Sequence, residues 1–153
     1  MTVENTDTIA AITTPRGNAG VGVIRISGPA TTEIIDQLCS TELEPRKATL
    51  SKIYDHESRL IDQVLLILFP SPHSFTGEDV LELQGHGGIV VLDMLLEHIL
   101  SIGCRQARAG EFSERAYLNG KIDLAQAEAI ADIRESHTPV SDTHPPSPRD
   151  PLR

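Results

Sequence analysis

The sequence is poor in the residues that build nucleic-acid-binding surfaces. It has no tryptophan, three phenylalanines and two tyrosines, which leaves few aromatic rings on which bases could stack. Acidic residues outnumber basic ones, 22 to 13, and the formal net charge is -9. A chain that holds nucleic acid through an overall basic field needs the opposite charge balance. We therefore expect no autonomous nucleic-acid binding.

Cysteine is scarce as well, with only Cys39 and Cys104 and no CxxC pair. Isolated thiols of this kind are typical of a reducing compartment, where they act as small apolar fillers. The six histidines form neither an HxxxH nor an HExxH pattern, so the sequence predicts no metal site. His86 lies between two glycines, which would leave its ring exposed, as in a functional histidine. A polar loop histidine is the simpler interpretation.

Long apolar runs are also missing. No segment approaches the roughly 20 apolar residues of a membrane-spanning helix. The N-terminus is acidic and leads into no apolar signal-peptide segment. We therefore expect a soluble, cytoplasmic protein without membrane contact. The 153 residues, 39% apolar and 23% charged, fit one globular domain, or one domain plus part of another.

The periodicity of the apolar residues predicts a mixture of strands and helices, and hence an α+β fold. Two β-branched runs form a hairpin around a Gly- and Pro-rich turn, and the run at 63–69 is apolar throughout, as in a strand covered on both faces. The helix at 89–102 has one polar stripe, at Asp93, Glu97 and Ser101, and is otherwise expected to be buried. The expected strands are residues 8–14, 21–27, 48–54, 63–69, 79–84 and 104–109, and the expected helices are 30–39, 89–102, 111–118 and 124–135.

The composition changes near the C-terminal end of the sequence. Asp123 and Gln126 have the spacing of a capping box at the start of the last helix. All 11 glycines precede residue 121, whereas five of the ten prolines lie between residues 139 and 151. Residues 137–153 have little to bury, and we expect a disordered, Pro-rich tail.

Two glycine-containing segments superficially suggest nucleotide binding. The first, at residues 17–22, has the order GxxGxG and leads into a strand, whereas the dinucleotide motif is GxGxxG and leads into a helix. A hairpin turn explains it better. The second, Gly120-Lys121, lacks the earlier glycine and the following Ser or Thr of a phosphate-binding loop. The sequence therefore encodes no nucleotide-triphosphate site.

Arg25 and Glu82 are charged residues in the interior of expected strands. Glu82 is flanked by leucines ahead of a glycine turn, where an unpaired carboxylate is costly. Arg25 lies within the apolar run Val-Ile-Arg-Ile, where an unpaired cation is also costly. One alternative is a salt bridge or the wet face of a sheet. The other is a polar ligand cavity, in which the carboxylate accepts two parallel hydrogen bonds from an amidine-like edge such as that of a pterin, and a cation holds an acidic part of the same ligand.

Four segments together resemble the N-terminal part of the MnmE (TrmE) family of tRNA-modifying GTPases. They are DTIAAITTPRG, GVGVIRISGP, SPHSFTGEDVLELQGHGG and GEFSERAYLNGKIDLAQAEAIAD. The resemblance runs from about Asp7 to Ile133, and the segment SFTGEDVLELQGHGG alone is highly specific.

The resemblance implies an α+β tetrahydrofolate-binding domain similar to the folate-binding fold of the aminomethyltransferase, followed by the first helix of a helical domain. Family members pair through this domain into homodimers. With the flavoprotein MnmG (GidA), they form 5-carboxymethylaminomethyl-type modifications at the wobble uridine of tRNA. The implied one-carbon cofactor is 5-formyl- or 5,10-methylene-tetrahydrofolate, and FAD supplies redox chemistry. GTP, Mg²⁺ and K⁺ belong to a GTPase domain that this sequence does not contain.

The resemblance also transfers three folate-binding residues to this sequence. They are Arg25 in VIRISG, Glu82 in LELQGHGG and Lys121 in LNGKIDLAQAEA. The first two are the charged strand residues that already called for an explanation. The third otherwise reads as a surface lysine at the start of a helix. We expect no catalytic and no metal-binding residue in this chain.

The sequence departs from the family pattern in three places. PRGNAG replaces a glycine-richer PxGRGG turn, AGEF replaces PGEF, and the resemblance ends after Ile133. A frameshifted or prematurely ended reading frame would explain why the resemblance stops at that point. We expect residues 1–120 to form the folate-binding and dimerisation domain, 121–136 to begin the helical domain, and 137–153 to form the tail.

Two alternatives to a folate-binding part of a tRNA-modification GTPase stay open. One is a truncated, non-functional remnant that folds and dimerises without ligand. The other is a stand-alone one-carbon protein that binds folate, like the aminomethyltransferase. Because no acid or base beyond Glu82 suggests catalysis, the chain alone is expected to have no enzymatic activity.

Overall fold

A computed structural model describes residues 7–14 and 20–135, which form a mixed sheet of six strands with four helices. The expected hairpin and the α+β composition are confirmed. Two expected strands are shorter than predicted, at residues 8–14 and 104–109. In chain order the elements are β1 (Ile9–Ile12), β2 (Val21–Ser27), α1 (Thr31–Leu38), β3 (Thr49–Tyr54), β4 (Leu60–Phe69), β5 (Val80–His86), α2 (Ile89–Ser101), β6 (Arg105–Gln106), α3 (Glu111–Leu118) and α4 (Leu124–Glu135).

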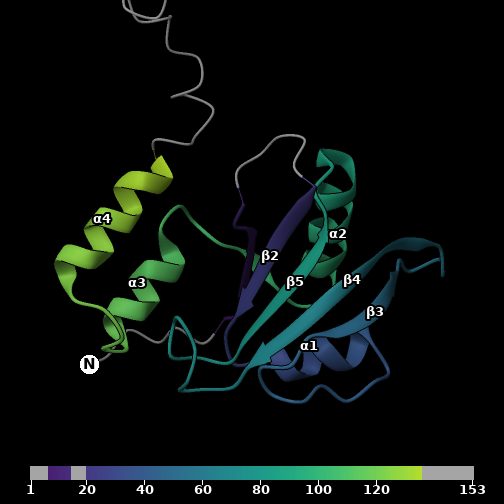
Figure 1. Cartoon of the computed structure of the whole chain (residues 1–153), viewed down its shortest axis with the longest axis horizontal. Helices are drawn as coiled ribbons and strands as arrows, with labels where there is room; N and C mark the ends of the chain where they lie inside the picture. The colour runs from purple at the N-terminus through teal and green to yellow at the C-terminus, as the bar shows by residue number, and fades with distance from the viewer. Residues whose placement is uncertain (1–6, 15–19, 136–153) are drawn as a thin grey trace, which may run out of the picture.

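The strands are arranged in the order β3-β4-β5-β2-β1-β6 (Figure 1). Neighbouring strands are antiparallel, except that the short β6 runs parallel to β1. The two central strands, β2 and β5, come from segments that are more than 50 residues apart in the sequence. Their pairing brings Arg25 and Glu82 directly opposite each other.

The hydrophobic core lies between one face of the sheet and the helices α1 and α2. Alternate residues of β2 and β5 supply its centre, because successive side chains of a strand point to opposite faces. Leu81 and Leu83, on either side of Glu82, share this buried face, and both are at most 1% exposed. The helices add Ile34, Ile35, Leu38, Leu92, Leu95, Leu96 and Ile99.

On the opposite face of the sheet, the loop before β5 and α3 lie over Arg25 through the rings of Phe75 and Phe112. Figure 1 shows α3 and α4 next to each other beyond the β1 end of the sheet. Further along, Leu50 of β3 and Leu65 of β4 pair with each other and remain 60% and 37% exposed. The expectation that the strand at 63–69 is covered on both faces is therefore wrong. Both helices of the core, α1 and α2, lie on the other side.

The prediction that the helix at 89–102 is buried apart from one polar stripe is also wrong. Val90 is 70% exposed, Met94 44% and Ile89 41%. One side of α2 packs on the sheet, and no described element covers its outer side, so apolar residues stand beside the expected polar ones.

The last described helix begins as predicted. The backbone N–H of Gln126 donates to the Asp123 carboxylate at 2.8 Å, and the backbone N–H of Asp123 donates to Oε1 of Gln126 at 2.9 Å. This reciprocal pair is a capping box. The predicted tail at 137–153 lies outside the described residues. No described helix is long and apolar enough to span a membrane.

Candidate functional site

Arg25 and Glu82 form the centre of the candidate site. Both side chains point away from α1 and α2, because the residues on either side of each are buried in the core. Nη2 of Arg25 lies 3.6 Å from Oε2 of Glu82, which is an ion pair but exceeds hydrogen-bond length. The side chains keep 16% and 23% of their surface exposed. The salt bridge that the sequence suggested is thus present, and it leaves both groups partly accessible.

Two aromatic rings hold the Arg25 guanidinium in place. Its Cζ atom lies 4.9 Å from the ring centroid of Phe75 and 5.2 Å from that of Phe112. At such distances the guanidinium is attracted by the ring quadrupoles. Phe75 belongs to the loop before β5 and Phe112 to α3. Two separate segments therefore fix the position of this cation on the sheet.

Lys121 reaches the same loop from the end of α3. Its Nζ donates to the carbonyl oxygen of Pro72 at 3.0 Å. Pro72 is three residues from Phe75, the ring that contacts Arg25. The structure thus brings all three sequence-predicted residues to one loop. Arg25 and Glu82 lie under it as an ion pair, and Lys121 lies at its outer edge.

Gly77 allows this loop to approach α3 closely. Its φ is +85°, in the region that favours glycine. A Cβ at this position would lie 3.0 Å from Cβ of Asn119 and 3.4 Å from Cγ of Lys121. The loop and the residues after α3 therefore pack together only because this position carries no side chain.

Arg115 is a buried cation that sequence reasoning missed. It is 1% exposed and lies on the inner side of α3. Its Nη1 donates to the Asp7 carbonyl oxygen at 2.9 Å and to both oxygens of Glu78 at 3.2 Å. Its Nη2 donates to Oδ1 of Asp7 at 2.6 Å and lies 3.6 Å from Oε2 of Glu111. One guanidinium thus joins three segments of the chain.

A sequence signal for Arg115 did exist. Phe112, Arg115 and Ala116 have the i, i+3, i+4 spacing of one helix face, and all three are buried. An arginine on an otherwise apolar face needs carboxylate partners. The sequence could not show which of its many acids those partners are, because Glu78 is 37 residues away.

Hydrogen bonds continue from Arg115 into the loop at the candidate site. The Ser27 hydroxyl, two residues after Arg25, donates to Glu78 at 2.6 Å and lies 2.7 Å from Oγ1 of Thr76. Asn119 donates to the Thr76 carbonyl oxygen at 2.8 Å. Thr76 is fully buried and adjoins Phe75. The network therefore fixes the loop that carries the ring over Arg25.

Hydrogen bonds from arginines lower the pKa of two carboxyl groups in this network, those of Asp7 and Glu111. A hydrogen bond from Arg105 lowers the pKa of Asp7 to about 2, with a further hydrogen bond from Arg115. Burial raises the pKa of Glu111, but hydrogen bonds from Arg105 and from the backbone of Arg108 outweigh it, and the net pKa is lowered. These carboxylates are therefore ionised at neutral pH.

His86 is more than a free loop residue. It ends β5, and its backbone N–H donates to Oδ2 of Asp62 at 2.9 Å. Its ring Nδ1 lies 2.6 Å from Oδ1 of the same carboxylate. Asp62 is 8% exposed, whereas the imidazole side chain is 74% exposed. A buried acid thus orients an accessible ring at the end of the strand that carries Glu82.

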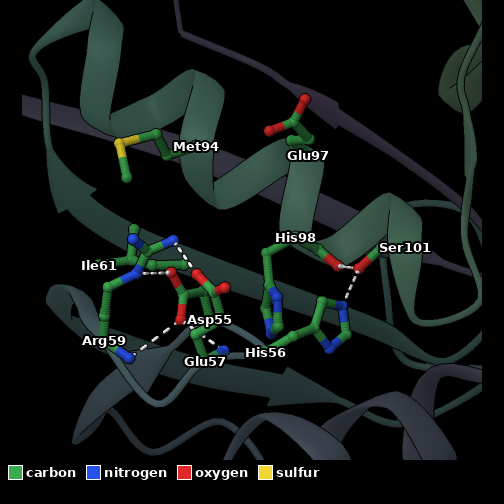
Figure 2. A pocket seen from close by; sticks show the side chains of 9 residues that line it. All are labelled: Asp55, His56, Glu57, Arg59, Ile61, Met94, Glu97, His98 and Ser101. Carbon is green, nitrogen blue, oxygen red and sulfur yellow. Dashed lines mark hydrogen bonds and ion pairs between the residues drawn. The ribbon is translucent and has the colours of Figure 1, made fainter.

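No group of three or more His, Cys, Asp or Glu side chains in the described part could hold a metal ion. Burial raises the pKa of the Cys104 thiol to about 12, so this cysteine is an unreactive filler, as the sequence predicted. A separate cavity lies between α2 and the turn after β3 (Figure 2).

Comparison with known proteins identifies the family. A family model described as "GTP-binding protein TrmE N-terminus" matches residues 8–121. That range includes Arg25, Glu82 and Lys121, and it covers most of the chain. The chain belongs to this family. The resemblance that the sequence motifs indicated is thereby confirmed.

Several curated relatives carry the name "tRNA modification GTPase MnmE". The protein of Methylococcus capsulatus is 55% identical over 141 residues, which are 92% of this chain and 32% of the relative. That of Marinobacter nauticus is 58% identical over 131 residues, 86% of this chain and 29% of the relative. That of Ectopseudomonas mendocina is 57% identical over 130 residues, which are 85% of this chain and 29% of the relative. The chain spans about three tenths of the length of these relatives.

Proposed function

We propose that this chain is the folate-binding and dimerisation part of a tRNA modification GTPase. The observation that carries the proposal is the arrangement of Arg25, Glu82 and Lys121 around one loop. Arg25 and Glu82 lie opposite each other with part of their surface open, and Lys121 holds the loop from its other side.

The chemistry of a reduced folate suits these groups. Its 2-amino-4-oxo-pterin presents two parallel N–H groups, which the Glu82 carboxylate can accept together. Its glutamate tail is anionic and pairs with a cation. Arg25 is fixed by two rings, whereas Lys121 is exposed and gives up only one hydrogen bond to a loop carbonyl when it turns to a ligand. The cofactor we propose is 5-formyl- or 5,10-methylene-tetrahydrofolate.

We also propose an activity for the full-length protein of which this chain is a part. With the flavoprotein MnmG (GidA), which carries FAD, the full-length enzyme would form 5-carboxymethylaminomethyl-type modifications at the tRNA wobble uridine. GTP, Mg²⁺ and K⁺ would act in its GTPase domain, and the protein would work in the cytoplasm. The relatives named as tRNA modification GTPases support this assignment.

The uncovered face of the sheet supports pairing of two copies. Leu50 and Leu65 are cross-strand partners there, and Gln84 and Val23 continue the same row across β5 and β2. Val21 lies nearby on β2 and is 56% exposed. This row, which we call the apolar strip, is apolar except for Gln84, and exposed apolar patches of this kind are typical of association surfaces. We propose that a second copy of the chain covers it.

Calorimetric titration with 5-formyltetrahydrofolate tests the folate proposal. We expect saturable binding by the folded chain and at least a tenfold weaker affinity after Glu82→Ala, because the carboxylate supplies a bidentate contact. Glu33→Ala is the matched control, since it removes an exposed glutamate from α1, on the other side of the sheet. Absence of binding by folded protein, or equal affinity of the two variants, contradicts the site.

Sedimentation velocity separates the folate proposal from the pairing proposal. A dimer that binds no folate would be the remnant that the sequence left open as an alternative. A Leu50→Lys, Leu65→Glu double variant should be monomeric at concentrations where the unaltered chain is dimeric, because it places charges on the apolar strip. Unchanged sedimentation of this variant would exclude the sheet face as the contact surface.

A further inference from the structure

A cavity of about 510 Å³ lies on the side of α2, away from the candidate folate site. Figure 2 shows it between the outer side of this helix and the turn that joins β3 to β4. A second cavity of about 370 Å³ adjoins it and extends to the end of α1. The two share Asp55, His56 and His98 as a common wall.

The size and floor of the first cavity suit a small organic molecule. Ligand sites usually enclose about 300–1,000 Å³ and combine apolar walls with a few polar groups. Met94 and Ile61 supply the apolar surface of the cavity. The Met94 side chain is apolar and yet 44% exposed. Methionine adapts its shape to a bound group more readily than a branched side chain does.

The charged residues around this cavity are predominantly acidic. Of the four that line it, Asp55, Glu57 and Glu97 are acids and Arg59 is the base. Arg59 pairs with Asp55 at 3.0 Å and also with Glu57, so its charge is compensated within the turn. Backbone and side-chain hydrogen bonds from Arg59 keep the pKa of Asp55 low. Glu97 has no ion-pair partner among the residues that the structure describes.

Two helix C-termini add to the negative potential. Leu38 ends α1 and lines the second cavity, and Ser101 ends α2 and lines the first. The carbonyl end of a helix carries partial negative charge and favours cations. The last turn of α1 has no basic residue, and that of α2 has only His98. Burial, and then the proximity of His56, lowers the pKa of His98, so this ring is neutral at pH 7.

The wall between the two cavities has a defined hydrogen-bond direction. The Ser101 hydroxyl donates to the His98 carbonyl oxygen at 2.6 Å, so its oxygen is left to accept from Nε2 of His56 at 2.8 Å. The His56 and His98 rings lie 4.9 Å apart between centroids. The wall therefore consists of ordered ring surface next to an apolar floor.

We propose that this cavity binds an organic cation, that is, a primary ammonium group carried on a small apolar body. The apolar body packs against Met94 and Ile61, and the ammonium group lies toward Glu97 and the carbonyl end of α2. An anion of the same shape is excluded by the same charges. This site is independent of folate and of the Arg25–Glu82 pair, which lies on the opposite face of the sheet.

The test uses 2-phenylethylammonium as probe and methyl-labelled methionine as reporter. The chain has two methionines, so the methyl spectrum isolates Met94. We expect a saturable shift of the Met94 signal, with a dissociation constant on the order of 1 mM. The anion 3-phenylpropionate, which has the same phenylethyl body, should give no saturable shift, and neutral 2-phenylethanol should bind at least about threefold more weakly than the ammonium.

Paired variants assign the charge effect to the cavity. Glu97→Gln should weaken ammonium binding about threefold, and Glu57→Gln should weaken it in the same direction. Glu33→Gln changes the net charge equally at the other end of α1 and should leave binding unchanged. Amide spectra verify that each variant is folded. A Met94 signal that does not saturate, equal binding of the three probes, or equal affinities of the Glu97 and Glu33 variants would overturn the proposal.

Discussion

The guanidinium of Arg115 donates to both carboxylate oxygens of Glu78, although 37 residues separate them in the sequence. This contact attaches α3 to the loop before β5. Through Ser27 and Thr76 it also fixes the part of the loop that carries Phe75. The candidate folate site therefore depends on a residue that does not belong to it.

Replacing Arg115 by methionine should destabilise the fold by about 3–5 kcal/mol, because Glu78 would lose its ion-pair partner and remain as a poorly hydrated charge. Urea unfolding measures the change. Arg108→Met is the control, since Arg108 is 65% exposed in its ion pairs and should cost less than about 1 kcal/mol. Similar losses in both variants would show that burial of Arg115 is energetically unimportant.

Gly77→Ala should cost about 1–3 kcal/mol, because alanine is strained at a φ of +85° and its Cβ would press on Asn119. The same substitution should weaken folate binding, since it moves the loop away from Lys121. Gly20→Ala is a matched change at a position with nothing within 4 Å of the added Cβ. Thermal unfolding compares the two, and an equal melting temperature would contradict the close approach inferred here.

Asp7 should contribute to the acid unfolding of the protein. Its pKa in the folded state is about 2, below its ordinary value of 3.8. The carboxylate therefore stabilises the fold above pH 3.8 and loses this contribution as the pH falls toward 2. Asp7→Asn should show a smaller loss of stability between pH 5 and pH 2, measured by denaturant unfolding at each pH. A slope identical to that of the unaltered chain would contradict this prediction.

His98 should titrate below its ordinary value of 6.5, because burial and the nearby His56 disfavour its charged form. A lowered pKa in a base means that the unfolded chain binds more protons, so stability decreases as the pH falls below 6.5. His56→Gln removes the second cause and should raise the His98 pKa. Imidazole proton shifts measured against pH report the His98 pKa in the unaltered chain and in the variant. An unchanged His98 titration in the variant would refute the effect of His56 on this pKa.

Local features of the fold were predictable from the sequence. The capping box of Asp123 and Gln126 depends on residues three positions apart, and the strand around Glu82 was indicated by its two-residue period. The apolar residues on both sides of Glu82 and Arg25 marked these two charges as unusual. The family motifs supplied Lys121, which no periodicity distinguishes from a surface lysine.

The exposure of apolar residues was not predictable in the same way. Leu65 lies in an apolar run and Val90 in an apolar helix, yet both are exposed. Hydrophobic pattern shows which residues prefer burial, but coverage depends on which elements pack on each face. Only one face of the sheet is covered along its whole width by helices of the described chain.

The sequence by itself determined the family, the element types and two of the three charges at the candidate site, because these follow from local spacing and side-chain chemistry. The tertiary structure decided what those charges contact. The register of β2 and β5 placed Arg25 opposite Glu82, and the packing of α3 on the loop brought in Phe112, Arg115 and Lys121. Such contacts join residues far apart in the chain, and a buried ion finds its partners only when the chain is folded.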